Sequence, residues 1–421
     1  MLTNEEILNM KYVKIVRLML IPIAGWPGEQ FGENMLTRKK YLKYYLVVYN
    51  TIMTVGVFNY ISKFLMTQSF FTAGHSVICA SLGILTHIKL CSFHLENYGR
   101  TIKTFFTDFH LVNFKDKSKL HMTVYKQIEK ISYYTSVFVA ISTVMAMISF
   151  NMTPMYNNIK NGVFRKERPP NVTIDYIVSY LFFNYNTDDH FYTSTFLICY
   201  FNTVMVSLSV AIPDLLFILI VFQIIGHIKV LDKTFQNIPQ PKTTRIRCQY
   251  KNGNIDVDYA VYGTEENKNI QNFLKECIFH HRTIMSFTND AASLFGPILG
   301  SNYMYQLCNC CILLLELSQG GTDALTQYGT LTFVICYQLI VVSILYEEVH
   351  TASSRLKDAV YGMPWESMDM KNQRTVYIIL YMIQTPIQVT AFHMVTVGVV
   401  TMSKILKSTF SYYAFLRTKK H

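Results

Sequence analysis

Residues 195–225 read TFLICYFNTVMVSLSVAIPDLLFILIVFQII, and Asp214 is the one charged side chain in this stretch. A run of this kind is long enough to cross the ~30 Å hydrocarbon core of a bilayer, which needs about 20 residues of helix. Six other stretches have the same character. The seven predicted spans are 44–66, 71–93, 132–152, 195–225, 283–318, 324–349 and a broken one at 375–416. The sequence therefore predicts an all-α membrane protein with seven transmembrane helices.

The composition of the whole chain agrees with this fold class. Of its 421 residues, 51% are hydrophobic and 15% are charged, with 29 Phe and 29 Tyr, which is too apolar and too aromatic for a soluble protein. The net charge of +11 is explained by basic loops that set the topology and contact anionic membrane lipid, so nucleic acid is not expected as a partner. The start, MLTNEEILNM, lacks the pattern of a secretory signal peptide.

The basic residues lie mainly on one side of the predicted spans. The loops after spans two, four and six carry seven, nine and four Lys or Arg residues, whereas those after spans one, three and five carry none, four and none. Because basic loops stay in the cytoplasm, the N-terminus is predicted to be cytoplasmic and the C-terminus extracellular. This orientation is the reverse of that of a G-protein-coupled receptor.

The spans divide the chain into five segments. In the cytoplasmic N-terminal segment, 1–43, the apolar patch 15–25 is too short to cross and is expected to be interfacial or re-entrant. Asn171, in the sequon Asn-Val-Thr of the outer loop, is predicted to face outward and to be glycosylated. The remaining segments are 44–225 with helices one to four and outer loop 153–194, 226–282 with a cytoplasmic loop and helix, 283–374 with helices five and six and their cytoplasmic extensions for anchoring and assembly, and 375–421 with the broken seventh helix.

Catalysis, a cofactor and a metal site are not predicted. The chain contains no GxxxxGK[ST], HExxH or GxSxG motif, and its nine Cys lie in spans or on the predicted cytoplasmic side, so an extracellular disulfide is not expected. Cys308, Cys310 and Cys311 do not converge on one point of a helix and are interpreted as core residues. Asp214, next to Pro213, is the most deeply placed ionisable residue and a functional candidate, since a charge in lipid is costly.

The outer halves of several spans are rich in aromatic and soft side chains. Such a lining suits a closed pocket for a small, mainly apolar ligand, with one or two hydrogen-bonding groups that fix its orientation. Ordinary helix packing uses the same residue types, so both interpretations stay open for each residue. The ligand-binding candidates are Phe71, His75, Ile78, Met145, Ser149, Tyr200, Val204, Phe333 and Tyr337.

The seventh span is too long for one crossing. A continuous helix over 375–416 would be ~60 Å long at 1.5 Å per residue, and Pro386 interrupts it. The first piece is therefore expected in the cytoplasm, and a second, membrane-crossing helical piece is expected from Thr390 onward. The small and hydroxylated residues of this second piece indicate either tight helix contact or the wetted wall of a pore.

Two groups of residues in the last part of the chain form a recognisable pattern. The C-terminal group comprises Thr390, Ala391, His393, Val397, Ile405, Leu406, Lys407, Ser411, Tyr412, Tyr413, Leu416 and Arg417, and a short cytoplasmic signature before it comprises Ser354, Leu356, Ala359, Tyr361 and Trp365. These residues resemble the insect odorant receptor family. The chain departs from that family's usual Gly, Pro and Ser at Phe392, Thr396 and Gly398. The segment IAGWPG at 23–28 is similar to the tuning receptors of moths and butterflies.

The resemblance implies a tuning subunit of an odorant-gated, non-selective cation channel that forms a heterotetramer with an obligate co-receptor. It implies a small volatile ligand, permeating cations, and a location in the plasma membrane of an olfactory neuron dendrite. It also assigns a hydrophobic gate to Phe415 and a polar extracellular ring to Thr418. A gustatory receptor-type channel of the same superfamily is an alternative, and a G-protein-coupled receptor is a more distant one.

Helical geometry extends the gate into a stripe. At 100° per residue, Lys404, Ser408 and Ser411 fall within about 40° of the direction of Phe415. These residues and Thr418 are the pore candidates. The competing interpretation is that the stripe packs against other helices and that Lys404 pairs with a carboxylate.

Overall fold

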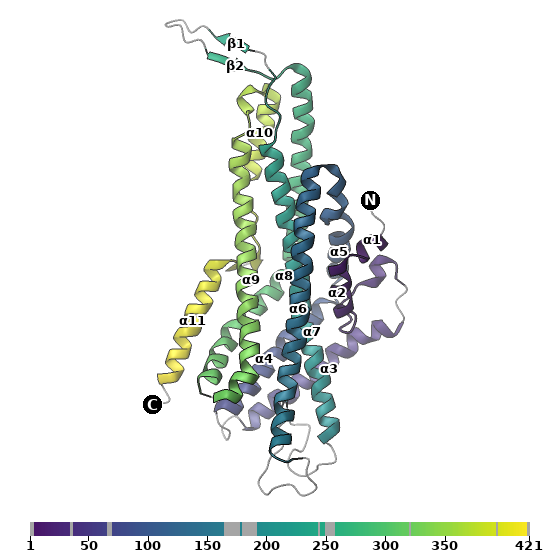
Figure 1. Ribbon diagram of the computed structural model, residues 1–421, viewed down its shortest axis with the longest axis vertical. Helices are drawn as coiled ribbons and strands as arrows, with labels where there is room; N and C mark the ends of the chain where they lie inside the picture. The colour runs from purple at the N-terminus through teal and green to yellow at the C-terminus, as the bar shows by residue number, and fades with distance from the viewer. Residues whose placement is uncertain are drawn as a thin grey trace.

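Long helices that run side by side build most of the chain in the computed structural model (Figure 1). The structure describes residues 4–33, 37–64, 70–163, 177–178, 192–242, 245–248, 257–319, 321–392 and 395–418. The predicted all-α, seven-helix fold class is confirmed. The helices at the seven predicted spans are α3 (Thr37–Phe64), α4 (Phe70–Ser92), α6 (Lys119–Lys160), α7 (Tyr192–Gln236), α8 (Thr264–Gln319), α9 (Gly321–Tyr361) and α11 (Val399–Thr418).

Several of these helices are much longer than a bilayer requires. The 56 residues of α8 extend ~84 Å at 1.5 Å per residue, so α8 continues far beyond the hydrocarbon core. The sequence predicts such an extension for the fifth span. Within the described residues, four helices are long and apolar enough to cross a membrane by length and composition alone, at Gly74–Ser92, Lys119–Lys160, Ser194–Gln236 and Thr332–Tyr361.

The N-terminal segment packs against the bundle instead of standing alone. It contains α1 (Asn4–Leu8), α2 (Lys11–Leu20) and the short turn η1 (Gly28–Phe31), and α2 contacts α6 and α7. Val16, Leu20 and Ile23 are fully buried. One face of the apolar patch 15–25 is therefore covered by the chain's own helices, whereas Leu18 is 72% exposed. That the patch is interfacial or re-entrant stays a prediction.

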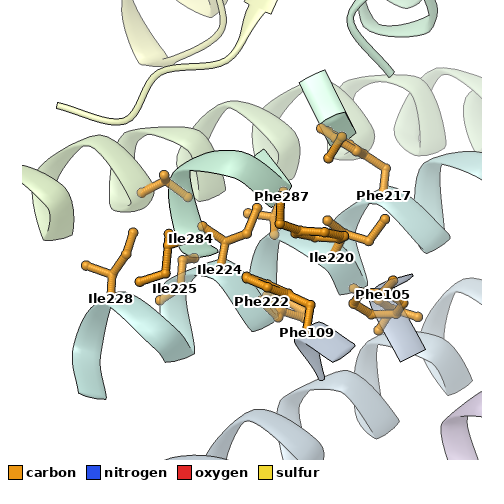
Figure 2. Close-up of a cluster of buried hydrophobic side chains, with 14 of the residues drawn as sticks. Phe105, Phe109, Phe217, Ile220, Phe222, Ile224, Ile225, Ile228, Ile284 and Phe287 are labelled. Carbon is orange, nitrogen blue, oxygen red and sulfur yellow. The ribbon is translucent and has the colours of Figure 1, made fainter. Parts of the chain in front are cut away.

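The connection between α4 and α6 packs against both α7 and α8. It comprises α5 (Glu96–Thr104), the π-helical turn η2 (Phe105–Phe109) and the turn η3 (Leu111–Lys117). In Figure 2, Phe105 and Phe109 point into the same cluster as the Ile and Phe side chains of α7 and Phe287 of α8. The rings of Phe109 and Phe287 are stacked with centroids 4.0 Å apart.

Two histidines fix the same connection by hydrogen bonds. His227 Nε2 donates to the carbonyl of Phe109 at 2.5 Å, so its Nδ1 is the acceptor for His280 Nε2 at 2.9 Å. Burial lowers the pKa of His227 to about 4 and that of His280 to about 2. Both rings are therefore neutral near pH 7, as this pairing requires.

Gly226 marks the closest approach of α7 to this connection. A Cβ atom at Gly226 would lie 2.4 Å from Leu111 Cδ1 and 3.0 Å from Ile128 Cγ1, and both neighbours are buried. A helical Gly→Ala change normally stabilises by about 0.5–1 kcal/mol, but overpacking costs ~1–3 kcal/mol. We therefore expect Gly226→Ala to lower the melting temperature of the detergent-purified protein. Gly263→Ala, whose Cβ would approach only Glu266 Oε2 at 3.8 Å, is the control; equal melting temperatures would contradict the steric argument.

The break in the seventh span is a hairpin and not only a kink. After α10 (Met370–Met382), the strands β3 (Thr390–Ala391) and β4 (Val395–Thr396) pair antiparallel, with Thr390 opposite Thr396. The prediction of helix from Thr390 onward is wrong for these residues, and the helix begins at Val399. A second hairpin, β1 (Arg245–Cys248) with β2 (Val257–Ala260), lies at the top of the view in Figure 1.

Two glycines of α8 hold the hairpin in place. Phe392 has φ of +50°, the left-handed region that favours glycine, which accounts for the Gly common at this position in the family pattern. Its N–H donates to the carbonyl of Gly296 at 3.4 Å. Its ring packs directly against Gly300. A Cβ atom at position 300 would lie 2.2 Å from Cδ2 of Phe392. The pairing of β3 with β4 and the bond to Gly296 supply backbone hydrogen bonds here in place of helical ones.

Candidate ligand-binding site

A cavity of about 100 Å³ lies between α3, α4, α6 and α7. Each helix contributes residues three or four apart, which is one helical face. Its walls are mainly apolar, with a smaller set of amide and hydroxyl groups. The apolar members are Met53, Val57, Ile78, Leu82, Ala146, Phe150, Val178 and Val206, and the others are Asn50, Thr54, Cys79, Gly83, Asn202, Thr203 and Ser207.

The polar members are held by local contacts. Asn50, which is buried, donates from Nδ2 to the carbonyl of Gly83 at 3.1 Å. A Cβ on Gly83 would lie 2.5 Å from Thr54 Oγ1, so α3 and α4 approach closely at this level. Thr203 donates its hydroxyl hydrogen to the carbonyl of Cys199 at 2.9 Å. Its oxygen lone pairs therefore remain available to accept a hydrogen bond.

His75 lies beside the cavity wall. Its ring stacks on Phe150 with centroids 5.8 Å apart, and its Nε2 donates to the carbonyl of Ile177 at 3.0 Å. Ile177 and the lining residue Val178 belong to a small buried cluster with Met53. The imidazole thus fixes the segment that contributes Val178 to the wall.

The structure brings a minority of the sequence-predicted ligand residues to this cavity. Ile78 lines it and His75 is adjacent. Ser149, Val204 and Tyr337 are half-buried; Tyr337 packs against Phe138. Met145, Tyr200 and Phe333 are 54%, 48% and 62% exposed on the surface of the single chain, so they do not line a pocket within it. The side chain of Phe71 and the residue Asn171 lie outside the described residues.

The lining of α6 and α7 differs from the prediction by about one residue. Ala146, not Met145, faces the cavity, as do Thr203 and Val206, not Val204. The spans are apolar on all sides, so periodicity does not reveal which face turns inward. Glycines within a span, such as Gly83, could have indicated the inward face, because a glycine in a helix often marks the close approach of another helix.

The helix α11 packs on α8 and α9 and leaves its predicted pore stripe uncovered. Ile405 and Thr409 are buried against those helices, and Cys311 Sγ lies 3.6 Å from the Thr409 carbonyl. On another face, Lys404, Ser411 and Phe415 are exposed, and Ser408 is half-buried. In Figure 1, α11 stands at the flank of the bundle. The side chain of Thr418 lies outside the described residues.

A buried ion pair joins α4 to α7 near the cavity. Lys89 Nζ lies 2.7 Å from Asp214 Oδ2, with side chains 0% and 6% exposed. The sequence analysis singled out Asp214 but not its partner. Lys89 is the one Lys, Arg, Asp or Glu in 71–93, as Asp214 is in 195–225. A single positive charge in the second span and a single negative charge in the fourth indicate such a pair, because a charge buried in the membrane needs a partner.

These features define a seven-helix membrane protein with a small, mainly apolar cavity between its helices. The model of the 7tm odorant receptor family matches residues 69–410. The chain belongs to this family.

Curated relatives match over a shorter stretch. The chain is 23% identical to Putative odorant receptor 85d of Drosophila melanogaster over 147 residues, which is 35% of this chain and 36% of that protein. It is 22% identical to Odorant receptor 10 of Aedes albopictus over 162 residues, 37% of this chain and 42% of that protein. Each match thus spans less than half the length of the relative, and these relatives are receptors and not enzymes.

Solved structures match over nearly the whole chain. The olfactory receptor OR5 of Machilis hrabei superposes with a TM-score of 0.73 at 14% identity, covering 96% of this chain and 97% of that one. The same receptor in complex with eugenol gives 0.75 at 13% identity, covering 98% and 99%. At this level of identity the likeness shows the fold, and the chain is a multi-pass membrane protein of that architecture.

Proposed function

We propose that this chain is the odorant-binding subunit of a ligand-gated, non-selective cation channel, and that the cavity between α3, α4, α6 and α7 holds a small, mainly apolar volatile. The observation that carries the proposal is this cavity, whose walls are mostly apolar and whose polar groups are few. The eugenol complex of a receptor with the same fold supports a ligand of this class.

The volume and lining of the cavity indicate the size and polarity of the ligand. An apolar cavity of ~150 Å³ accepts benzene, whereas this one measures about 100 Å³. A volatile larger than one ring therefore requires side chains of the lining to move. Thr203 can accept a hydrogen bond, so a hydroxyl on an otherwise apolar molecule fits the polar end.

Opening of a pore follows from differential binding. A ligand shifts the closed–open equilibrium only as far as it binds the open state more tightly. The proposed pore wall is the uncovered stripe of α11, completed by a co-receptor in a heterotetramer. The N-terminus is placed in the cytoplasm and the C-terminus outside by the charge asymmetry of the loops, in the plasma membrane of an olfactory neuron dendrite.

Whole-cell recording tests the proposal. The chain is expressed with an insect odorant co-receptor and challenged with eugenol, benzaldehyde, 1-hexanol and hexyl acetate. We expect at least one volatile to evoke a cation current that requires both subunits. A response confined to non-volatile tastants would favour the gustatory alternative, and a response that needs G proteins would favour the G-protein-coupled alternative.

A further inference from the structure

One carboxylate of α7, in the middle of the bundle, bonds to three other helices. Besides Lys89 of α4, Asp214 of α7 accepts hydrogen bonds from Asn302 of α8, at 3.0 Å to Oδ1, and from Gln338 of α9, at Oδ2. Lys89 Nζ also donates to the carbonyl of Val210 at 2.9 Å. The two charges are therefore paired and well supplied with hydrogen bonds.

Stability alone does not account for this arrangement. Desolvating two ions offsets most of their attraction, and a well-packed apolar pair at such a site is often at least as stable. The position next to it is also a weak point of α7. Pro213 lacks the N–H that would bond to the carbonyl of Ser209, so the helix can bend beside Asp214 more easily than elsewhere.

The pair lies on the same helix faces as the cavity wall. On α4, Leu82 lines the cavity and Lys89 follows seven residues later; on α7, Ser207 lines it and Asp214 follows seven residues later. Seven residues return within about 20° of the same direction and advance ~10 Å. A ligand that spreads α4 from α7 thus acts directly on the ion pair.

The helices that donate to Asp214 also hold the start of α11. On α8, six residues before Asn302, the carbonyl of Gly296 accepts from the N–H of Phe392, in the hairpin that leads into α11. On α9, nine residues after Gln338, Glu347 Oε2 accepts from the N–H of Val399 at 3.4 Å. A carboxylate at a helix N-terminus stabilises it. Movement of α8 or α9 at the level of Asp214 is therefore transmitted to α11 through packed and hydrogen-bonded groups.

We propose that Lys89 and Asp214 are positioning residues that couple the ligand cavity to α11. The inference rests on the proposed channel function. Binding in the cavity changes the separation of α4 and α7, and the shared carboxylate transmits that change to α8 and α9. Without the charges, the ligand still binds but opens the pore less well.

The test is the neutral double variant Lys89→Met/Asp214→Asn. Its Asn oxygen still accepts from Asn302 or Gln338, and it leaves no unpaired buried charge. We expect normal surface levels and an unchanged melting-temperature shift by the most effective volatile of the panel. The maximal current should fall at least ~5-fold, which is the lower end of typical coupling between sites. A wild-type concentration–current curve in this variant would overturn the proposal.

Two further variants complete the experiment. The exposed pair Lys229–Glu348, at 3.5 Å, also joins α7 to α9, so Lys229→Met/Glu348→Gln is the matched control and should behave as wild type. If the neutral double variant does not reach the surface, Gln338→Met cuts the link to α9 while keeping the ion pair, and unchanged gating there would equally overturn the proposal. Absence of current in the wild type would instead refute the channel function itself.

Discussion

Replacing Ala146 by Phe should nearly abolish ligand-evoked current while the protein still reaches the cell surface. Ala146 is half-buried and lines the cavity from α6, so a phenyl ring there fills the space that the ligand needs. A ligand that loses ~1.5–3 kcal/mol of apolar burial binds ~10-fold or more weakly. The measurement is a concentration–response curve with the most effective volatile of the panel, alongside surface labelling.

The neighbouring residue supplies the control. Met145 is 54% exposed and points about 100° away from Ala146 around α6, so Met145→Phe introduces the same ring outside the cavity. We expect a wild-type response from this variant. A wild-type response from Ala146→Phe would place the ligand elsewhere, and equal loss in both variants would indicate a general effect on α6 and not occupation of the cavity.

The spans could be predicted from the sequence, whereas the choice between Ala146 and Met145 as the cavity-facing residue could not. The spans were predictable because their length and apolarity are set by the bilayer. The inward face was not, because the walls of a bundle in lipid are apolar on both sides and carry no amphipathic stripe. Aromatic residues at the predicted level, such as Tyr200 and Phe333, turn outward in the single chain.

The hairpin before α11 could not be predicted from the sequence for a different reason. Thr390 to Thr396 read as a continuation of an apolar helix. Their conformation depends on Gly296 and Gly300, which are almost a hundred residues earlier in the chain and leave room for Phe392. Such a long-range contact overrides local propensity. The Lys89–Asp214 pair, in contrast, was accessible from the sequence, because each is the sole charged residue of its predicted span.

Replacing Phe415 by Ser should raise the current that flows without ligand. Phe415 is 57% exposed on the single chain and lies on the same face of α11 as Ser408 and Ser411, away from the buried Ile405 and Thr409. A hydroxyl-rich face of this kind suits a central pore. If the closed gate buries the ring, its loss removes ~1.5–3 kcal/mol from the closed state and increases basal opening ~10-fold or more.

Two companion variants define what the result means. Phe410 is 60% exposed but points about 140° away from Phe415 at 100° per residue, so Phe410→Ser should leave basal current unchanged. Lys404 lies eleven residues before Phe415, ~16 Å along the helix, where we expect a wider, hydrated vestibule that tolerates a charge. Lys404→Gln should therefore alter conductance only weakly. Because an apolar constriction blocks ions by excluding water, only the residue at the constriction should affect basal current and ion selectivity together. Unchanged basal current and permeability in Phe415→Ser, at normal surface levels, would assign the gate to the partner subunits alone.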